Sequence, residues 1–244
     1  TDLVSAMIGN ATKSISKEKF NEEIDFLGAT INFYDSGASA SGLSRYSSRI
    51  LELLADGALN PLFTQADFDA ERAKLIEGLK SDEKSASAIA ARVQNVLTYG
   101  KEHYNGEFTS EETLKNVTLQ DVINHYNTYF VPSNAYLVVI GDVKTADVKK
   151  KVEELFGADV WKKATAPNLT YNDPKDLQYS QINFVDVPNA VQSEIALINL
   201  SKLKMNDKDY FAAILANQIL GGGGEGRLFL NLREKHGWTY GSYS

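Results

Sequence analysis

The chain has 244 residues, of which 43% are hydrophobic and 23% charged, and this composition predicts a folded globular protein. No apolar run approaches the roughly 20 residues of a membrane-spanning helix, so no transmembrane segment is predicted. The formal net charge is -7 and the Lys and Arg residues are scattered, which argues against nucleic acid as a partner, because phosphate binding requires a clustered basic surface. Cysteine is absent, which excludes disulfides, thiolate zinc sites and a cysteine nucleophile.

Helix and strand patterns alternate from the start of the chain. Residues 16–28 carry apolar residues at i, i+4 and i+7, with Ser16 as the predicted N-cap and Gly28 as the predicted end of the helix. Residues 29–34 alternate as a strand. A second helix is predicted over residues 47–59 and ends before an Asn-Pro pair.

A long helical stretch is predicted from Asp67 toward Tyr99, with a loop in the polar residues 81–87. Residues 118–130 follow as a helix whose first and fourth residues, Thr and Asp, have the spacing of a capping box.

The apolar run 134–143 predicts a strand buried on both faces, and residues 145–157 predict a helix with its cap at Thr145 and its end at Gly157. Strands and helices alternate and helices dominate, so the fold class predicted from the residues is α/β.

The second part of the chain begins with a change of character. Residues 158–180 hold two of the five prolines and no sustained period, which predicts a linker. Two strand-like runs, 181–187 and 190–200, then precede a helix over residues 206–220. This order predicts a second domain of similar type, cut short at Ser244, and we therefore expect the chain to be a piece of a longer product.

A run of glycines follows that helix and contains G-x-G-x-x-G spacing at Gly221, Gly223 and Gly226. A dinucleotide loop requires a preceding strand and an acidic residue about 20 positions later, and neither fits here. The glycines instead predict a tight connection into a helix over residues 227–236, which Gly237 ends.

Arg233 lies near the end of this helix, and Tyr240 follows seven residues later in a strand-like tail. A guanidinium and a phenol hydroxyl could converge on backbone carbonyls of an extended ligand. Alternatively, Arg233 pairs with a carboxylate and Tyr240 packs against the protein. The residues alone leave both interpretations open.

The tail GRLFLNLREKHGWTYGSYS resembles a stretch characteristic of the pitrilysin-like, or insulinase-like, zinc peptidases. Three upstream stretches, at residues 20–40, 58–80 and 129–143, are similar to parts of the same family in the same order, so the resemblance covers nearly the whole chain. It implies two similar α/β (α+β) domains, each a sheet packed with several helices, around a cavity that cleaves extended peptides.

The resemblance also implies domain bounds. Residues 1–157 would form the first pitrilysin-like domain without its N-terminal strands, residues 158–180 the linker, and residues 181–244 the start of a truncated second domain. Some bacterial members of the family are exported to the periplasm or cell envelope, but nothing in these residues shows export.

In this family zinc is held by an H-x-x-E-H motif, whose Glu is the general base, and by a Glu on a later helix. The alignment places the motif on residues 2–6, where Asp2 and Ala6 replace the two His and Ser5 replaces the Glu. The later ligand falls on Gly78, and a neighbouring Glu is rotated by about 100° around the helix. The resemblance therefore implies no catalytic residue and no zinc in this chain, with zinc in a catalytic partner or half.

The family also carries an Arg and a Tyr seven residues apart that bind substrate carbonyls, and these match Arg233 and Tyr240. In its two-subunit members, one chain keeps zinc while the other loses zinc and keeps this pair. The resemblance thus implies a non-catalytic, substrate-binding subunit or half. Its partners would be an extended or unfolded peptide and a catalytic pitrilysin-like subunit or upstream half. The alternatives are a scaffolding protein of the same fold and a stand-alone peptide-binding module.

Overall fold

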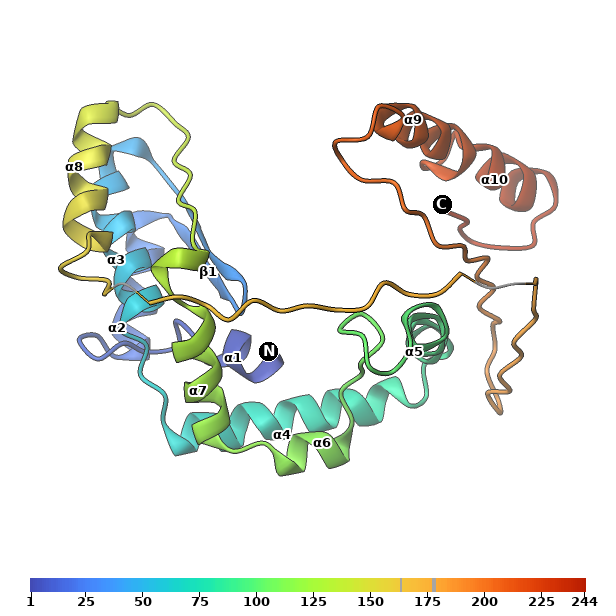
Figure 1. Ribbon diagram of the computed structural model, residues 1–244, viewed down its shortest axis with the longest axis horizontal. Coiled ribbons are helices and arrows are strands. Elements are labelled where there is room, and N and C mark those ends of the chain that lie inside the picture. The colour runs from blue at the N-terminus through green and yellow to red at the C-terminus, as the bar shows by residue number, and fades with distance from the viewer. Residues whose placement is uncertain (163, 177–178) are drawn as a thin grey trace. The chain divides into compact units, whose positions relative to one another are not determined.

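The computed structural model describes residues 1–162, 164–176 and 179–244 (Figure 1). The predicted linker 158–180 includes the three remaining positions, 163, 177 and 178, which lie outside the described residues. Contacts divide the chain into two compact units, Thr1–Ala196 and Leu197–Ser244. The domain bounds inferred from the sequence remain a prediction.

The first unit begins with a short helix, α1 (Asp2–Met7), and a longer one, α2 (Lys17–Leu27). Both predicted ends of α2 are confirmed. The Ser16 hydroxyl accepts a hydrogen bond from the backbone N–H of Lys19, and Gly28 has the left-handed φ of 56° that ends many helices.

The sheet of the first unit is a hairpin. Strand β1 (Thr30–Tyr34) confirms the predicted strand and pairs antiparallel with β2 (Gly37–Ser41), so that Tyr34 lies opposite Gly37. A 3₁₀ turn, η1 (Ser44–Tyr46), leads into helix α3 (Ser47–Leu59), which packs against both strands. Buried side chains from α2 and α3 form the core under the hairpin: Phe20, Leu27, Ile50 and Leu53.

Helices α4 (Gln65–Asp82) and α5 (Ala86–Tyr99) confirm the long helical stretch and its break. Helix α6 (Glu111–Asn116), which the sequence did not predict, precedes α7 (Leu119–Tyr129) and the 3₁₀ turn η2 (Pro132–Asn134). A second core lies where α1 meets α4 and α7, and its buried residues are Leu3, Val4, Met7, Ile8, Phe68, Leu114 and Val122.

The capping box of α7 is confirmed. The Asp121 carboxylate accepts the backbone N–H of Thr118 at 2.8 Å, and the hydrogen bonds from Thr118 lower the pKa of Asp121. Further along α7, the Tyr126 hydroxyl donates to the carbonyl of Ala58 at 2.6 Å, and burial raises the pKa of Tyr126 to about 12. This bond ties α7 to the end of α3.

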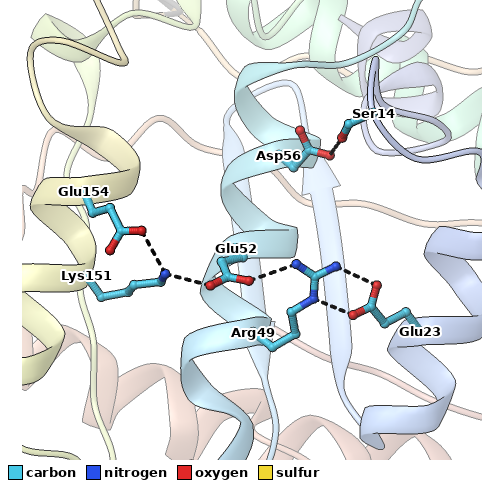
Figure 2. A network of polar contacts seen from close by, with 7 residues as sticks. All are labelled: Ser14, Glu23, Arg49, Glu52, Asp56, Lys151 and Glu154. Atoms are coloured by element: carbon cyan, nitrogen blue, oxygen red, sulfur yellow. Dashed lines mark hydrogen bonds and ion pairs between the residues drawn. The ribbon is translucent and has the colours of Figure 1, made fainter.

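Helix α8 (Thr145–Phe156) lies along α3 and is joined to it by a chain of ion pairs (Figure 2). Arg49 binds Glu23 of α2 with both Nε and Nη2, and its Nη1 lies 2.8 Å from Glu52. Lys151 of α8 continues the chain, 2.6 Å from Glu52. Hydrogen bonds from Lys151 and then from Arg49 lower the pKa of Glu52. The network therefore links three helices: Arg49 joins α3 to α2, and Lys151 joins α8 to α3.

Three predictions made for residues 134–200 are wrong. Thr145 is the first residue of α8 and not its cap, because the N-cap is Lys144, which makes no side-chain capping bond.

Residues 135–140 are extended but not buried: Tyr136 is 98% and Ile140 92% exposed. The runs at 181–187 and 190–200 likewise form no strand among the described residues. In each extended run the described residues provide no neighbouring strand, and a strand needs one to satisfy its backbone groups.

The second unit contains α9 (Tyr210–Gly221), the short α10 (Arg227–Phe229) and a π-helix, η3 (Leu230–Lys235). Its strand-like tail, residues 238–244, forms no strand. In the part of the chain that the structure describes, helices are accompanied by one two-stranded sheet, which gives a mixed α/β fold. No described helix is long and apolar enough to cross a membrane.

Candidate functional site

The glycine run makes a tight connection between α9 and α10, as the sequence predicts. Gly223 has a φ of 91°, which only glycine adopts readily, and its N–H bonds to the carbonyl of Gly221 at 2.9 Å. A Cβ at Gly226 would lie 3.1 Å from the backbone of Gly221, and a Cβ at Gly221 would overlap Ser244. The side chain of Asn217 fixes the same tail residue by donating to the Ser244 carbonyl at 2.8 Å.

Arg233 lies in the π-helix that follows this connection. The wider winding shows in the hydrogen bond from His236 N–H to the Asn231 carbonyl, five residues back, at 3.2 Å. The Arg233 guanidinium carbon lies 5.0 Å from the ring centroid of Phe229, one turn earlier, so a cation–π contact supports it. A carboxylate oxygen of Glu234 lies 3.9 Å from its Nε, and the Arg233 side chain is 46% exposed. The guanidinium thus keeps donors available to solvent.

The predicted end of this helix at Gly237 is confirmed. Gly237 has a φ of 66° and donates to the Arg233 carbonyl at 2.9 Å, while Trp238 donates to the Leu232 carbonyl at 2.9 Å. The bond from Gly237 to Arg233 is that of the αL C-cap motif, and the bond from Trp238 to Leu232 spans one residue more than a Schellman motif would. They fix the backbone of the outgoing tail to the turn of helix that carries Arg233.

Tyr240 stands in this tail, and 82% of it is exposed. The residue before it, Thr239, is partly buried and donates its hydroxyl to the Gly241 carbonyl at 2.7 Å, which turns the backbone locally. Within residues 197–244, all of which are described, no hydrogen bond or ring contact joins Tyr240 to Arg233. The structure therefore holds both donors exposed within one unit but does not bring them into contact.

Sequence reasoning missed two aromatic neighbours of this pair. Trp238 is exposed and its indole stacks on the ring of His236, with centroids 4.3 Å apart. The signal was present in the spacing, because His236 and Trp238 both lie between Arg233 and Tyr240 in the sequence.

The residues aligned with the zinc motif lie on α1 and make structural contacts. The Asp2 carboxylate accepts from the Thr109 hydroxyl at 3.1 Å. The Ser5 hydroxyl accepts the backbone N–H of Asp35 at 2.8 Å and so holds the hairpin turn against α1. The Ala6 carbonyl accepts from an Asn side chain at 2.6 Å.

Gly78, aligned with the later zinc ligand, lies on α4 and has open space where a side chain would begin. Its neighbour Glu77 is paired with Lys80 at 3.1 Å. Among the described residues, no group of three or more His, Asp or Glu side chains is placed to share a metal ion. Each of the three histidines contacts an aromatic ring instead: His103 stacks on Tyr99 and Tyr104, His125 tilts against Tyr129 and His236 stacks on Trp238.

Comparisons with known proteins identify the family. Residues 116–244, more than half of the chain, match the family described as the Peptidase M16 inactive domain. The chain belongs to this family. The resemblance to a non-catalytic member of the pitrilysin-like zinc peptidases is thereby confirmed.

Individual relatives support this assignment. An uncharacterized zinc protease of Bacillus subtilis (strain 168), YmxG, is 24% identical over 98% of the chain and 58% of its own length. The crystal structure of a peptidase M16 inactive domain from Pseudomonas fluorescens has a TM-score of 0.75 at 22% identity, over 99% of the chain and 59% of that structure. A protease from Helicobacter pylori has a TM-score of 0.77 at 17% identity over the same shares. These two structures show the fold. The chain spans less than two thirds of the length of each of the three relatives.

Proposed function

We propose that this chain is the substrate-binding, non-catalytic subunit or half of a pitrilysin-like zinc endopeptidase that degrades or processes extended peptides. The observation that carries the proposal is a contrast between two sets of positions. The positions aligned with the zinc ligands and base hold Asp2, Ser5, Ala6 and Gly78, whereas the positions aligned with the carbonyl-binding pair hold Arg233 and Tyr240.

The chemistry of this pair suits the proposed role. Extended peptides are commonly bound by main-chain hydrogen bonds, which give affinity that tolerates many sequences. When zinc polarises a scissile carbonyl, donors placed where negative charge develops stabilise the transition state. The guanidinium of Arg233 and the hydroxyl of Tyr240 would supply such donors, while zinc and the general base would come from the catalytic subunit or half. Either half alone would be inactive.

The proposed architecture follows from the same family membership. Residues 1–157 would belong to one pitrilysin-like domain and residues 181–244 to a second, joined by the linker 158–180. The exposed apolar runs at 135–140 and 181–187 fit this proposal, since each would need a neighbouring strand and none lies beside it among the described residues.

The test combines the purified chain with a family member that carries H-x-x-E-H and follows cleavage of internally quenched peptides. We expect cleavage only by the mixture, and about a 10- to 1000-fold lower kcat/KM with Arg233→Ala or Tyr240→Phe. Matched controls from the same unit are Arg227→Ala and Tyr210→Phe, which should leave the rate unchanged. If neither Arg233→Ala nor Tyr240→Phe lowers the rate of an active mixture, the assigned role is wrong. If mixing never produces cleavage, a scaffolding role is favoured.

Zinc content is measured on the same samples. After incubation with excess zinc and desalting, we expect near zero zinc per chain, because three of the aligned positions offer no imidazole or carboxylate and the fourth, Asp2, already accepts a hydrogen bond from Thr109. Close to one zinc per chain would show that the alignment of the motif with residues 2–6 is wrong.

A further inference from the structure

The loop that follows α5 is a compact turn built around His103. The backbone N–H of Gly106 donates to the His103 carbonyl at 2.7 Å, and the His103 N–H donates to the Gly100 carbonyl at 3.3 Å. The backbone N–H of Asn105 donates to Nδ1 of the His103 ring at 3.1 Å, which fixes the direction of the imidazole. A Cβ at Gly106 would overlap the Gly100 carbonyl oxygen, so the turn closes tightly. The His103 ring is therefore held in place by its own loop.

Three aromatic side chains of this region form one surface, which we call the aromatic platform: Tyr99, His103 and Tyr104. The His103 ring stacks on that of Tyr99, with centroids 5.1 Å apart, and on that of Tyr104, with centroids 4.4 Å apart. Tyr171, from the predicted linker 158–180, lies against the platform, with its ring centroid 5.6 Å from that of His103 and 4.7 Å from that of Tyr104. Both pairs are tilted, by 52° and 56°, and tilted aromatic pairs at such separations attract one another. A linker residue far away in the sequence thus packs on this surface.

The linker also contacts the first unit at two earlier positions. The Trp161 ring lies 6.3 Å from that of Phe156 on α8, and the backbone N–H of Ala166 donates to the Ser133 hydroxyl at 3.1 Å. The ring pair is local in sequence, and an exposed hydrogen bond exchanges with bonds to water and contributes little by itself. Tyr171 instead removes ring surface from water, since 46% of it is exposed. It is therefore the principal contact between the linker and the first unit.

The sequence around Tyr171 suits a docked segment. Tyr171 is the one aromatic residue in the segment 164–176. Pro167 and Pro174 lie on either side of it. Because proline fixes φ, the chain has less conformational entropy to lose when the segment is held in one place. The segment thus brings one aromatic anchor on a restrained backbone.

We propose that Tyr171 is an anchor that straps the predicted linker to the first unit, with the aromatic platform as its docking surface. Docking restrains the described residues between Ala166 and Tyr171, and release of Tyr171 sets them free to move. A shorter free tether raises the effective concentration of the segments that it joins. The strap is therefore a device that sets the working length of the linker. It does not depend on the proposed peptidase role, since it uses none of the residues assigned to that role.

The first test observes His103 by NMR in the 244-residue chain labelled with ¹³C-histidine. The chain has three histidines, and His103→Gln assigns the signal. Because an aromatic ring shifts the resonances of protons packed near it, Tyr171→Ala should move the His103 ring signals and leave those of His125 and His236 in place. Tyr171→Phe keeps the ring and should retain the wild-type shift. The control is Tyr179→Ala, at a linker tyrosine that is 73% exposed, and it should move no histidine signal.

The second test measures how far the strap is restrained, by cleavage of the folded chain with endoproteinase Lys-C after Lys175, an exposed residue four positions beyond the anchor. Mass spectrometry follows the fragments. Loss of two aromatic contacts should make this cleavage about 10-fold faster in Tyr171→Ala, whereas Tyr171→Phe and Tyr179→Ala should match the wild type. Tyr104→Ala should also accelerate it, and adding Tyr171→Ala should give less than the product of the two effects.

The two measurements together decide the proposal. An unmoved His103 signal in Tyr171→Ala would overturn the anchor, and so would cleavage after Lys175 that is no faster in Tyr171→Ala than in Tyr179→Ala. Neither readout uses peptide cleavage by an assembled enzyme, so failure of the strap is distinguishable from failure of the proposed function.

Discussion

Phe33 occupies a slot between two glycines, and this slot gives the sharpest test of the packing. The ring packs against both core clusters of the first unit and lies 6.3 Å from the ring of Phe20. Gly57 of α3 faces one part of the ring, where an added Cβ would lie 2.8 Å from Phe33 Cε1 and closer still to Cζ. Gly9 faces another part, where a Cβ would lie 2.8 Å from Cγ. The backbones of Gly57 and Gly9 therefore approach this partly buried ring at two places, and Gly57→Ala should overpack the core where the ring meets α3.

Two opposing terms set the size of the effect. Alanine is favoured over glycine inside a helix by about 1 kcal/mol, which would stabilise α3. Forcing an extra methyl group into a packed core costs about 1–3 kcal/mol, and a confined aromatic ring places Gly57→Ala in the upper part of that range. The net expectation is a loss of about 1–2 kcal/mol in the free energy of unfolding. For a chain of this length the melting temperature should fall by about 2–8 °C.

The matched control is Gly78→Ala, a glycine inside α4 with no atom within 4 Å of the added methyl group. It should gain up to about 1 kcal/mol from helix propensity alone. Urea unfolding followed by circular dichroism at 222 nm measures both variants. Phe33→Leu in the Gly57→Ala background should recover part of the loss, which a double-mutant cycle resolves. If Gly57→Ala proves as stable as Gly78→Ala, the ring is not confined as described.

Two further predictions concern polar contacts. Tyr126→Phe removes the donor to the Ala58 carbonyl, and we expect a loss of about 1–2 kcal/mol by urea unfolding at pH 7. Because burial raises the pKa of Tyr126 to about 12, wild-type stability should fall as pH rises from 10 to 12, and the variant should lack this fall. Glu52→Gln weakens the contacts with Lys151 and Arg49, and since these side chains are partly exposed we expect a loss of about 0.5–1 kcal/mol at pH 7. The pKa of Glu52 is lowered in the folded state, so its contribution to stability should be present above the unfolded pKa of about 4.3 and should be lost as pH falls below that value. Equal pH dependence of stability in Glu52→Gln and wild type would contradict this prediction.

The sequence predicted the helices best where capping chemistry is local. Ser16 and Gly28 bracket α2, and a Thr-Asp pair begins α7, because each of these groups bonds to backbone within a few residues. Strand β2 could not be predicted in this way. Its five residues, GASAS, carry no alternation of large apolar and polar side chains, and it forms because β1 lies beside it.

The apolar run 134–143 shows the opposite failure. Its composition is that of a buried strand, yet side chains such as those of Tyr136 and Val138 are exposed and no strand pairs with the run among the described residues. Strand preference measures how well side chains fit a pleated, half-buried surface, so it depends on neighbours that the run itself does not contain. The same composition therefore supports a strand only where a sheet is completed around it.

The candidate site, too, was only partly predictable from the sequence. The position of Arg233 near a helix end, and the end itself at Gly237, follow from local sequence. The π winding around Arg233 does not, because it depends on the bond from His236 to Asn231 that replaces the ordinary spacing. Winding of this kind changes the direction in which a side chain leaves the helix, so the direction of the guanidinium was not predictable.

The proposed alignment of the zinc motif with residues 2–6 is compatible with the packing of α1. In an H-x-x-E-H motif the three functional side chains share one face of the helix, since they are spaced by three and four residues. On α1 the other face carries Leu3, Val4 and Met7, which are buried in the core against Phe68 of α4. Replacing the ligand face therefore removes no core contact. In the proposed alignment the packing of α1 on α4 and the chemistry of the zinc site are therefore separable, because the residues that pack the two helices are not the residues at the zinc positions.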